Sequence, residues 1–110
     1  MPIYLEALTL RLATAIAELP EELRSRHARY LLAKQRDDGG FAGREGGSDL
    51  YYTSFALRSL AMLGELYGQP AERAARFLRS KLGGQESIVD FLSLVYGAAL
   101  IDSAAGIDVF

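Results

Sequence analysis

The chain of 110 residues contains no cysteine, no tryptophan, three prolines and one histidine, and its net charge is only −2. The lack of cysteine excludes a disulfide framework, a thiolate nucleophile and thiolate metal ligands, and it fits the reducing cytoplasm. A chain without excess positive charge lacks the basic surface that nucleic-acid-binding proteins use. The longest run without a charged residue, 91–101, is far shorter than the roughly 20 residues of a membrane-spanning helix. We therefore expect a cytoplasmic protein with no nucleic-acid partner, no membrane span and no cofactor.

Hydrophobic residues, in contrast, are abundant. They make up 50% of the chain, against 24% charged residues. A domain this short has much surface for its volume, so not all of this apolar content is expected to fit inside. We expect the excess to pack against a second copy, giving a homo-oligomer, or against further repeats on the C-terminal side.

The hydrophobic pattern predicts about five helices and no strand, which makes the chain an all-α protein. The segments 3–18, 49–67 and 87–104 are apolar nearly all round, whereas 20–35 and 70–82 carry charges along one side. We expect Gly68 to end the third helix. This alternation predicts helical hairpins in two layers, with the apolar helices inside and the charged helices outside.

Two degenerate repeats, roughly 20–67 and 70–104, divide this single domain of residues 1–110. Tyr30-Leu31 in the first repeat corresponds to Phe77-Leu78 in the second, and Asp49-Leu50 corresponds loosely to Asp90-Phe91. A stack of such hairpins would bury a continuous apolar layer between its inner helices.

The most distinctive segment is the glycine loop, defined here as residues 35–48, which joins the second and third predicted helices. Gly39 and Gly40 permit a sharp turn, and Phe41 beside them needs an apolar place to pack. The amide of Gln35 can donate and accept, so we expect it to tie the end of its helix to the backbone of the loop. Asp49 is suited to cap the helix that follows.

The succession of Tyr30-Leu31-Leu32, Gln35, Gly39 and Phe41 resembles the glutamine–aromatic repeat motif of terpenoid cyclases and protein prenyltransferase β subunits. The continuation Asp49-Leu50-Tyr51-Tyr52-Thr53 is closer to the β subunits. The resemblance implies a partial α/α toroid, in which inner and outer rings of helices surround an apolar cavity for an isoprenoid chain. It also implies a fragment that binds or shapes this cavity and is not catalytic alone.

Site residues follow from the same resemblance. Arg44 and Tyr52 match positions that contact the diphosphate of the prenyl donor, whereas Gln35, Gly39, Gly40, Phe41 and Asp49 form the structural motif. An ordinary loop arginine, solvated or paired with Asp37 or Glu45, is the alternative for Arg44. The tyrosines of the apolar helices, Tyr4, Tyr51, Tyr52, Tyr67 and Tyr96, are expected in the core rather than along a tunnel.

Catalytic motifs of the family are incomplete in this sequence. Prenyltransferases bind zinc through an Asp, a Cys two residues later and a distant His. Asp49 matches the Asp, but Tyr51 stands at the Cys position and His27 precedes the motif, so no metal site is expected. Asp37-Asp38 does not match the acid motif of the cyclases and fits a turn instead. Whether the chain is an enzyme therefore stays open.

A function of another class also fits the sequence. The chain would then be a non-catalytic helical-hairpin interaction module that self-associates through its apolar inner face. A helical solenoid without any link to lipids is a third, more distant interpretation.

Overall fold

The computed structural model describes the backbone of residues 2–43, 46–84 and 87–110, and the side chains of these residues except 2–6 and 9. All regular structure in these ranges is helical. The helices are α1 (Pro2–Ala17), α2 (Glu21–Leu32), α3 (Leu50–Met62), α4 (Gly68–Lys81) and α5 (Ile88–Ala105). The prediction of an all-α chain with about five helices is confirmed.

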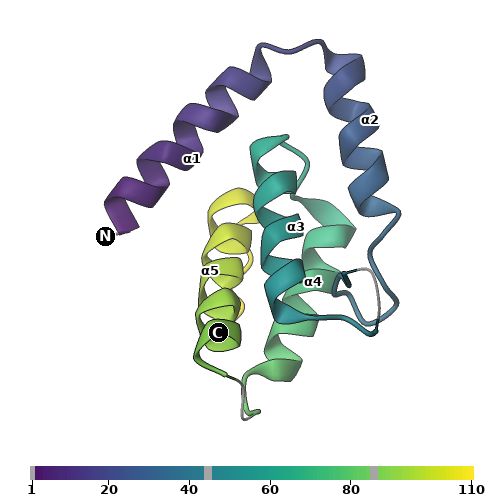
Figure 1. The fold of residues 1–110 in the computed structure, drawn as a ribbon, viewed down its shortest axis with the longest axis vertical. Coiled ribbons are helices and arrows are strands. Elements are labelled where there is room, and N and C mark those ends of the chain that lie inside the picture. Colours follow the sequence, from purple (N-terminus) through teal and green to yellow (C-terminus); the bar gives the residue numbers. More distant parts are fainter. Residues whose placement is uncertain (1, 44–45, 85–86) are drawn as a thin grey trace.

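The helices α3, α4 and α5 form a bundle, in which α3 and α5 lie side by side and run in the same direction (Figure 1). Helix α4 runs antiparallel to α3 and α5 and packs against this pair. The helices α1 and α2 form an arm that arches over the bundle (Figure 1). Each hairpin therefore contributes one helix to the α3–α5 pair, as α2 leads into α3 and α4 leads into α5.

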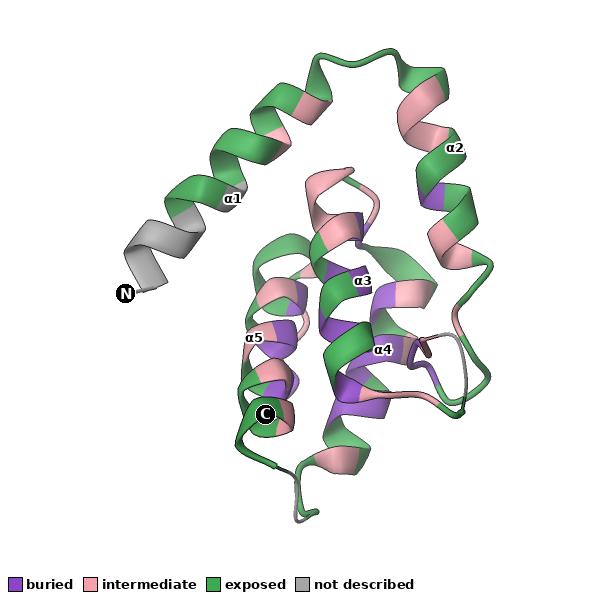
Figure 2. Cartoon of the chain, viewed as in Figure 1, coloured by how far each residue is buried: buried purple, intermediate pink, exposed green. Residues whose placement is uncertain are grey.

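The hydrophobic core lies within the bundle, where the buried residues concentrate (Figure 2). Leu57 and Leu60 of α3, Leu78 of α4 and Ile101 of α5 are each 0% exposed. The close contact of the helices depends on a small residue in α5, since a Cβ added at Gly97 would lie 3.3 Å from methyl carbons of both Leu57 and Leu78.

Helix α4 is amphipathic, as its sequence predicts. Its buried side consists of Ala71, Ala74, Ala75, Phe77 and Leu78. The alanines let α4 approach its neighbours closely, while the two larger side chains fill the core. The charged residues of α4 face outward.

Helix α3 ends at Met62, five residues before the predicted Tyr67. Gly64 adopts a φ of +76°, and two hydrogen bonds close the helix: Gly64 N to Ala61 O (3.1 Å) and Glu65 N to Leu60 O (2.9 Å). This pair of bonds defines a Schellman motif, in which a glycine just past the helix takes the left-handed conformation. The predicted stop at Gly68 is therefore wrong, because Gly68 begins α4.

The prediction that apolar helices lie inside is only partly right. Leu10 of α1 is 67% exposed, and Tyr51 and Phe55 of α3 are 56% and 53% exposed. The charged helices do lie outside, with Arg26 and Arg76 exposed. The arm contacts α3 but leaves one side of α3 and α5 open, where Tyr51, Phe55, Phe91 and Leu92 are exposed.

Helix α5 is long and apolar enough to cross a membrane by the measure of length and composition, with 22% of its 18 residues buried. This is weak evidence for a span, because the core helices of soluble proteins pass the same test. Leu94, Ala98 and Ile101 on its buried side pack in the bundle.

Candidate functional site

The glycine loop ties the two outer helices together through Gln35. The Nε2 atom of Gln35 donates to the carbonyl oxygen of Gly39 (2.9 Å) and to that of Pro70 in the first turn of α4 (3.0 Å). The first of these bonds is the predicted tie to the loop. The second was not predicted, and it fixes α2 relative to α4. Since α2 ends at Leu32 rather than at the predicted residue 35, Gln35 lies beyond the helix and can reach both carbonyls.

Arg73 of α4 adds two further hydrogen bonds to this link between α2 and α4. Its guanidinium donates to the carbonyl oxygen of Arg36 (2.7 Å) and to Oε1 of Gln35 (3.4 Å). Gly39 lies against the backbone of Arg73 so closely that an added Cβ would be 2.0 Å from its carbonyl oxygen, and its φ is +92°. Glycine is therefore required at this position for space and for backbone conformation.

Phe41 is buried, as predicted, with 3% of its surface exposed. Its backbone N–H donates to Oγ1 of Thr53 in the first turns of α3 (2.9 Å), and the Thr53 hydroxyl lies 3.3 Å from the Phe41 carbonyl. The buried hydroxyl thereby satisfies the Phe41 N–H, which the extended loop leaves without a backbone partner, whereas the Phe41 carbonyl also accepts from the Asp49 N–H (2.9 Å). The loop is thus attached to α2, α3 and α4 at once.

Asp38 shapes the turn within the loop, which confirms that it is a turn-former. Its Oδ1 accepts hydrogen bonds from the Gly40 N–H (2.9 Å) and the Ser48 hydroxyl (2.6 Å). Partial burial raises the pKa of the Asp38 carboxyl, but the two hydrogen bonds and the charges of Arg36 and Lys81 outweigh it, so that the pKa lies below its usual value.

Asp49 caps α3, as predicted. Its Oδ1 accepts from the backbone N–H groups of Tyr51 (2.7 Å) and Tyr52 (3.1 Å). These amides are the donors that a helix start offers to an anion, and here a carboxylate of the chain already occupies them. A diphosphate at this helix start would compete with Asp49 and meet its negative charge.

The two predicted diphosphate contacts, Arg44 and Tyr52, stay predictions. Arg44 lies outside the described residues. Tyr52 is 46% exposed, and its ring covers Gly43, where an added Cβ would be 2.5 Å from the ring. The structure thus places Tyr52 against the glycine loop, with its ring edge-to-face with Tyr51 at 5.5 Å between centroids.

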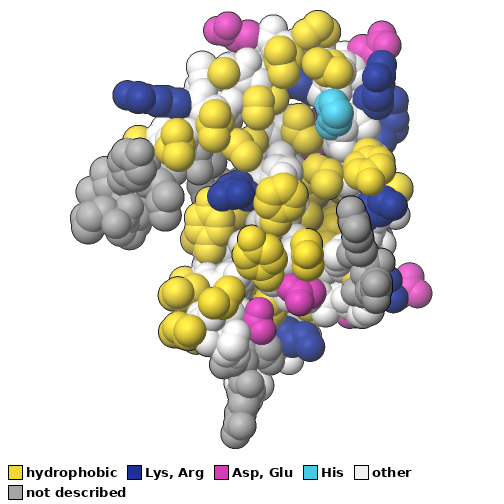
Figure 3. Space-filling view, viewed as in Figure 1, with side chains coloured by type: hydrophobic (Ala, Val, Ile, Leu, Met, Phe, Trp, Pro, Cys, Tyr) yellow, Lys and Arg dark blue, Asp and Glu magenta, His cyan; other side chains and the backbone are white. Residues whose placement is uncertain are grey.

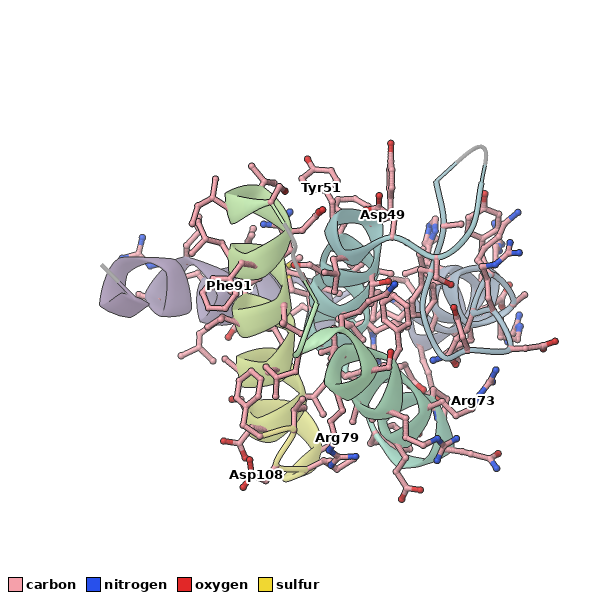
Figure 4. The ribbon with its side chains drawn as sticks, turned by 90° about the horizontal axis from the view of Figure 1, so that it is seen from below. Asp49, Tyr51, Arg73, Arg79, Phe91 and Asp108 are labelled. Atoms are coloured by element: carbon pink, nitrogen blue, oxygen red, sulfur yellow. The ribbon has the colours of Figure 1, made fainter. Side chains whose placement is uncertain are left out.

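The helices α3 and α5 expose an apolar surface, which we call the apolar wall. It comprises the exposed large hydrophobic residues of these helices, Tyr51, Tyr52, Phe55, Ile88, Val89, Phe91, Leu92 and Val95. Hydrophobic side chains gather over both helices on the face seen in Figure 3. Tyr51 and Phe91 project away from α4 (Figure 4). The expectation that Tyr51, Tyr52 and Tyr67 are core residues is therefore wrong, because all three are exposed. Tyr51 and Tyr52 lie on the open side of α3, and Tyr67 lies beyond the end of α3, at the start of α4. Tyr96 is half-buried, and the side chain of Tyr4 lies outside the described residues.

Apart from the apolar wall, a pocket lies under the arm, between α1, α2 and the end of α3. It is an open pocket of about 310 Å³ with an almost wholly apolar lining. The lining residues are Ile16, His27, Tyr30, Leu31, Ser59, Met62 and Leu63. His27 lies on its rim and is exposed. Within the described part of the chain, no group of three His, Asp or Glu side chains is arranged to hold a metal ion.

Two arginines of α4, Arg73 and Arg79, hold loops in place and were not predicted from the sequence. Arg73 lies near the middle of α4 and Arg79 in its last turn, on different sides of the helix (Figure 4). Arg79 donates to the carbonyl oxygens of Asp108 (2.8 Å) and Val109 (3.0 Å). Thus α4 binds the glycine loop, which precedes α3, through Arg73, and it binds the segment that follows α5 through Arg79. No local signal marks these arginines, because their partners are about thirty or more residues away in the sequence.

Comparison of the chain with models of protein families, with curated proteins and with solved structures finds no match in any of the three. The functional interpretation consequently depends on the site itself.

Proposed function

We propose that the chain is a segment of an α/α toroid of the kind found in protein prenyltransferase β subunits and terpenoid cyclases. Its apolar wall would line the cavity that receives an isoprenoid chain. The observation that carries the proposal is the wall, where aromatic and aliphatic side chains of two parallel helices are exposed together. Such a surface fits a long hydrocarbon ligand, because burying apolar area contributes about 25 cal/mol per Å².

The tie between the outer helices supports the same arrangement. Gln35 links α2 to α4 through the Pro70 carbonyl, while α3 and α5 pair on the other side of α4. Outer helices joined to one another and inner helices paired with one another are the geometry that a ring of hairpins needs. The proposed role is to bind and shape, since Asp49 is engaged as a helix cap and Tyr51 stands where the family has its cysteine.

Titration with farnesol tests this function. Farnesol is a neutral isoprenoid, so its binding reports the wall alone. Wild-type protein should bind it, and Phe91→Asp should weaken binding at least about tenfold by placing a charge against the chain. Tyr30→Asp is the matched control, because Tyr30 is also an exposed aromatic residue but lies at the pocket under the arm. Absence of binding, or a loss in Tyr30→Asp alone, would contradict the proposal.

A second candidate function is self-association through the same wall, and the surface area favours it. The chain exposes 7234 Å², whereas a compact monomer of its 12.0 kDa exposes only about 6,000 Å². The excess of about 1,200 Å² exceeds the roughly 800 Å² that each partner buries in a standard interface. Sedimentation velocity at tens of micromolar should reveal a dimer or larger species that Phe91→Asp disrupts. A monomer at every concentration would exclude this candidate.

A further inference from the structure

The part of the apolar wall that α5 contributes has a regular spacing. Four exposed residues of this helix follow one another at intervals of four, three and four positions: Ile88, Leu92, Val95 and Ala99. This is the a/d spacing of a coiled coil, which places the four side chains along one side of the helix. We call these four residues the α5 seam. Ile88 and Leu92 are 69% and 58% exposed with the arm in its place, so the seam is accessible to another helix.

The charged residues of α5 lie away from the seam or at its end. The helix contains two of them, Asp90 and Asp102. Asp90 precedes Leu94 by four residues and Gly97 by seven, and both of these are buried, so Asp90 lies on the side of the bundle. Asp102 is exposed and follows Ala99 by three residues, so it continues the seam into the last turn of α5.

The neighbouring cation does not belong to the seam. Arg58 is a residue of α3, where its guanidinium carbon lies 5.7 Å from the centroid of the Phe55 ring. The single ion pair among the described residues joins Arg26 to Glu22, so Asp102 has no cationic partner in this part of the chain. A negative charge in the last turn of a helix is also unfavourable, because the helix dipole is negative at that end. A well-matched partner would therefore bring positive potential to Asp102.

A second α5 that runs in the opposite direction provides this match. Pairing about the middle of the seam sets Ile88 opposite Ala99 of the second copy and Leu92 opposite Val95, so each larger side chain faces a smaller one. The same arrangement brings Asp102 to the start of the other α5, where the helix dipole is positive. Parallel pairing would instead set Asp102 against Asp102 of the second copy, and the two like charges would repel each other.

We propose that a second copy of the chain packs on the apolar wall through an antiparallel, two-fold pairing of the α5 seams. The inference rests on self-association, the second candidate function, and adds where and in which direction the two copies meet. A two-fold interface needs a surface that is complementary to itself, which the order of side chains along the seam supplies. The surface that the chain exposes in excess of a compact monomer, about 1,200 Å², is sufficient for such an interface.

Chemical cross-linking tests the direction of the pairing, because the chain has no cysteine of its own. Ile88→Cys and Ala99→Cys are prepared separately and treated with an ethylene-linked bismaleimide. In the antiparallel dimer equivalent cysteines lie about 16 Å apart along the helices, which this short reagent does not span. Each variant alone should therefore stay uncross-linked, whereas a mixture of the two should give a covalent dimer. Arg76→Cys, at an exposed position of α4, measures cross-linking by random collision.

Sedimentation velocity tests the seam itself. Leu92→Asp should weaken dimerisation at least about tenfold, because it places a charge at the centre of the interface. Leu10→Asp is the matched control and should leave the dimer unchanged, because Leu10 is 67% exposed but lies on α1. Asp102→Asn should weaken the dimer about threefold to thirtyfold, since a symmetric dimer loses the favourable contact with a helix dipole twice.

Each contrary result overturns a defined statement. Cross-linking of Ile88→Cys alone above the level of Arg76→Cys, or a tighter dimer in Asp102→Asn, would refute the antiparallel direction and leave self-association intact. A dimer that persists in Leu92→Asp, or that is lost in Leu10→Asp, would refute the seam and assign self-association to another surface. A monomer at every concentration would refute the inference together with the function on which it rests.

Discussion

Replacement of Gly39 by alanine provides a sharp test of how the glycine loop is held. The added Cβ would lie 2.0 Å from the carbonyl oxygen of Arg73 and 2.6 Å from the carbonyl carbon. Both obstacles are backbone atoms of α4, so no side chain can move aside to make room. The loop or the helix must shift, and the hydrogen bonds from Gln35 to Gly39 and Pro70 would be strained together.

Gly46 supplies the matched control. Its φ of +85° is close to the +92° of Gly39, yet no described atom lies within 4 Å of its added Cβ. Gly46→Ala should therefore show the backbone cost alone, about 1–2 kcal/mol. Gly39→Ala should lose a further ~1–3 kcal/mol for the forced displacement of packed atoms.

Thermal and urea unfolding followed by circular dichroism can measure the difference. For a domain of this size 1 kcal/mol corresponds to about 4–8 °C in Tm, so Gly39→Ala should melt at least about 5 °C below Gly46→Ala. Adding Arg73→Ala to Gly39→Ala should not restore stability, because the clash is with the backbone. Equal losses in the two glycine variants would refute the close contact between the loop and α4.

Three further predictions concern the same loop and the helix that follows it. Phe41→Ala should destabilise the fold by ~3–5 kcal/mol, as expected for a buried ring, and an unchanged Tm would remove Phe41 from the core. Asp49→Ala should cost about 1 kcal/mol through the lost N-cap, measurable by urea unfolding; no change would mean that water replaces the cap. The lowered pKa of Asp38 contributes stability that is fully present above its ordinary value of 3.8 and is lost as the pH falls through the lowered pKa. Ser48→Ala removes one cause of this lowering, so unfolding between pH 5 and 2 should begin at a higher pH; an unchanged acid profile would contradict that link.

The sequence predicts those features that follow from local chemistry. Asp49 is recognised as a cap because its side chain acts on amides two and three residues later. Phe41 is recognised as a buried residue because a large ring within flexible glycines has few other stable positions. The bond from Gln35 to Gly39 spans four residues and is within the reach of one side chain.

Features that depend on distant partners could not be predicted in this way. The hydrogen bond from Gln35 to Pro70 spans 35 residues, and no residue pattern near either position predicts it. The apolar composition of α1, α3 and α5 predicts that these helices are buried, but composition does not determine which of their faces pack against other helices. The exposure of Tyr51 and Phe91 depends on how helices distant in the sequence pack. The end of α3, in contrast, has a local signal in Gly64, so the predicted stop at Gly68 is wrong for a reason that the sequence itself contains.

We propose that the apolar wall of α3 and α5 receives an isoprenoid chain. The most direct measurement is an NMR titration with farnesyl diphosphate, followed through assigned aromatic and methyl resonances. The largest shifts are expected at Phe55, Phe91 and Val95, with small shifts at the pocket residues Ile16 and Met62. Shifts concentrated at Ile16 and Met62, or none at the wall at saturating ligand, would contradict the claim.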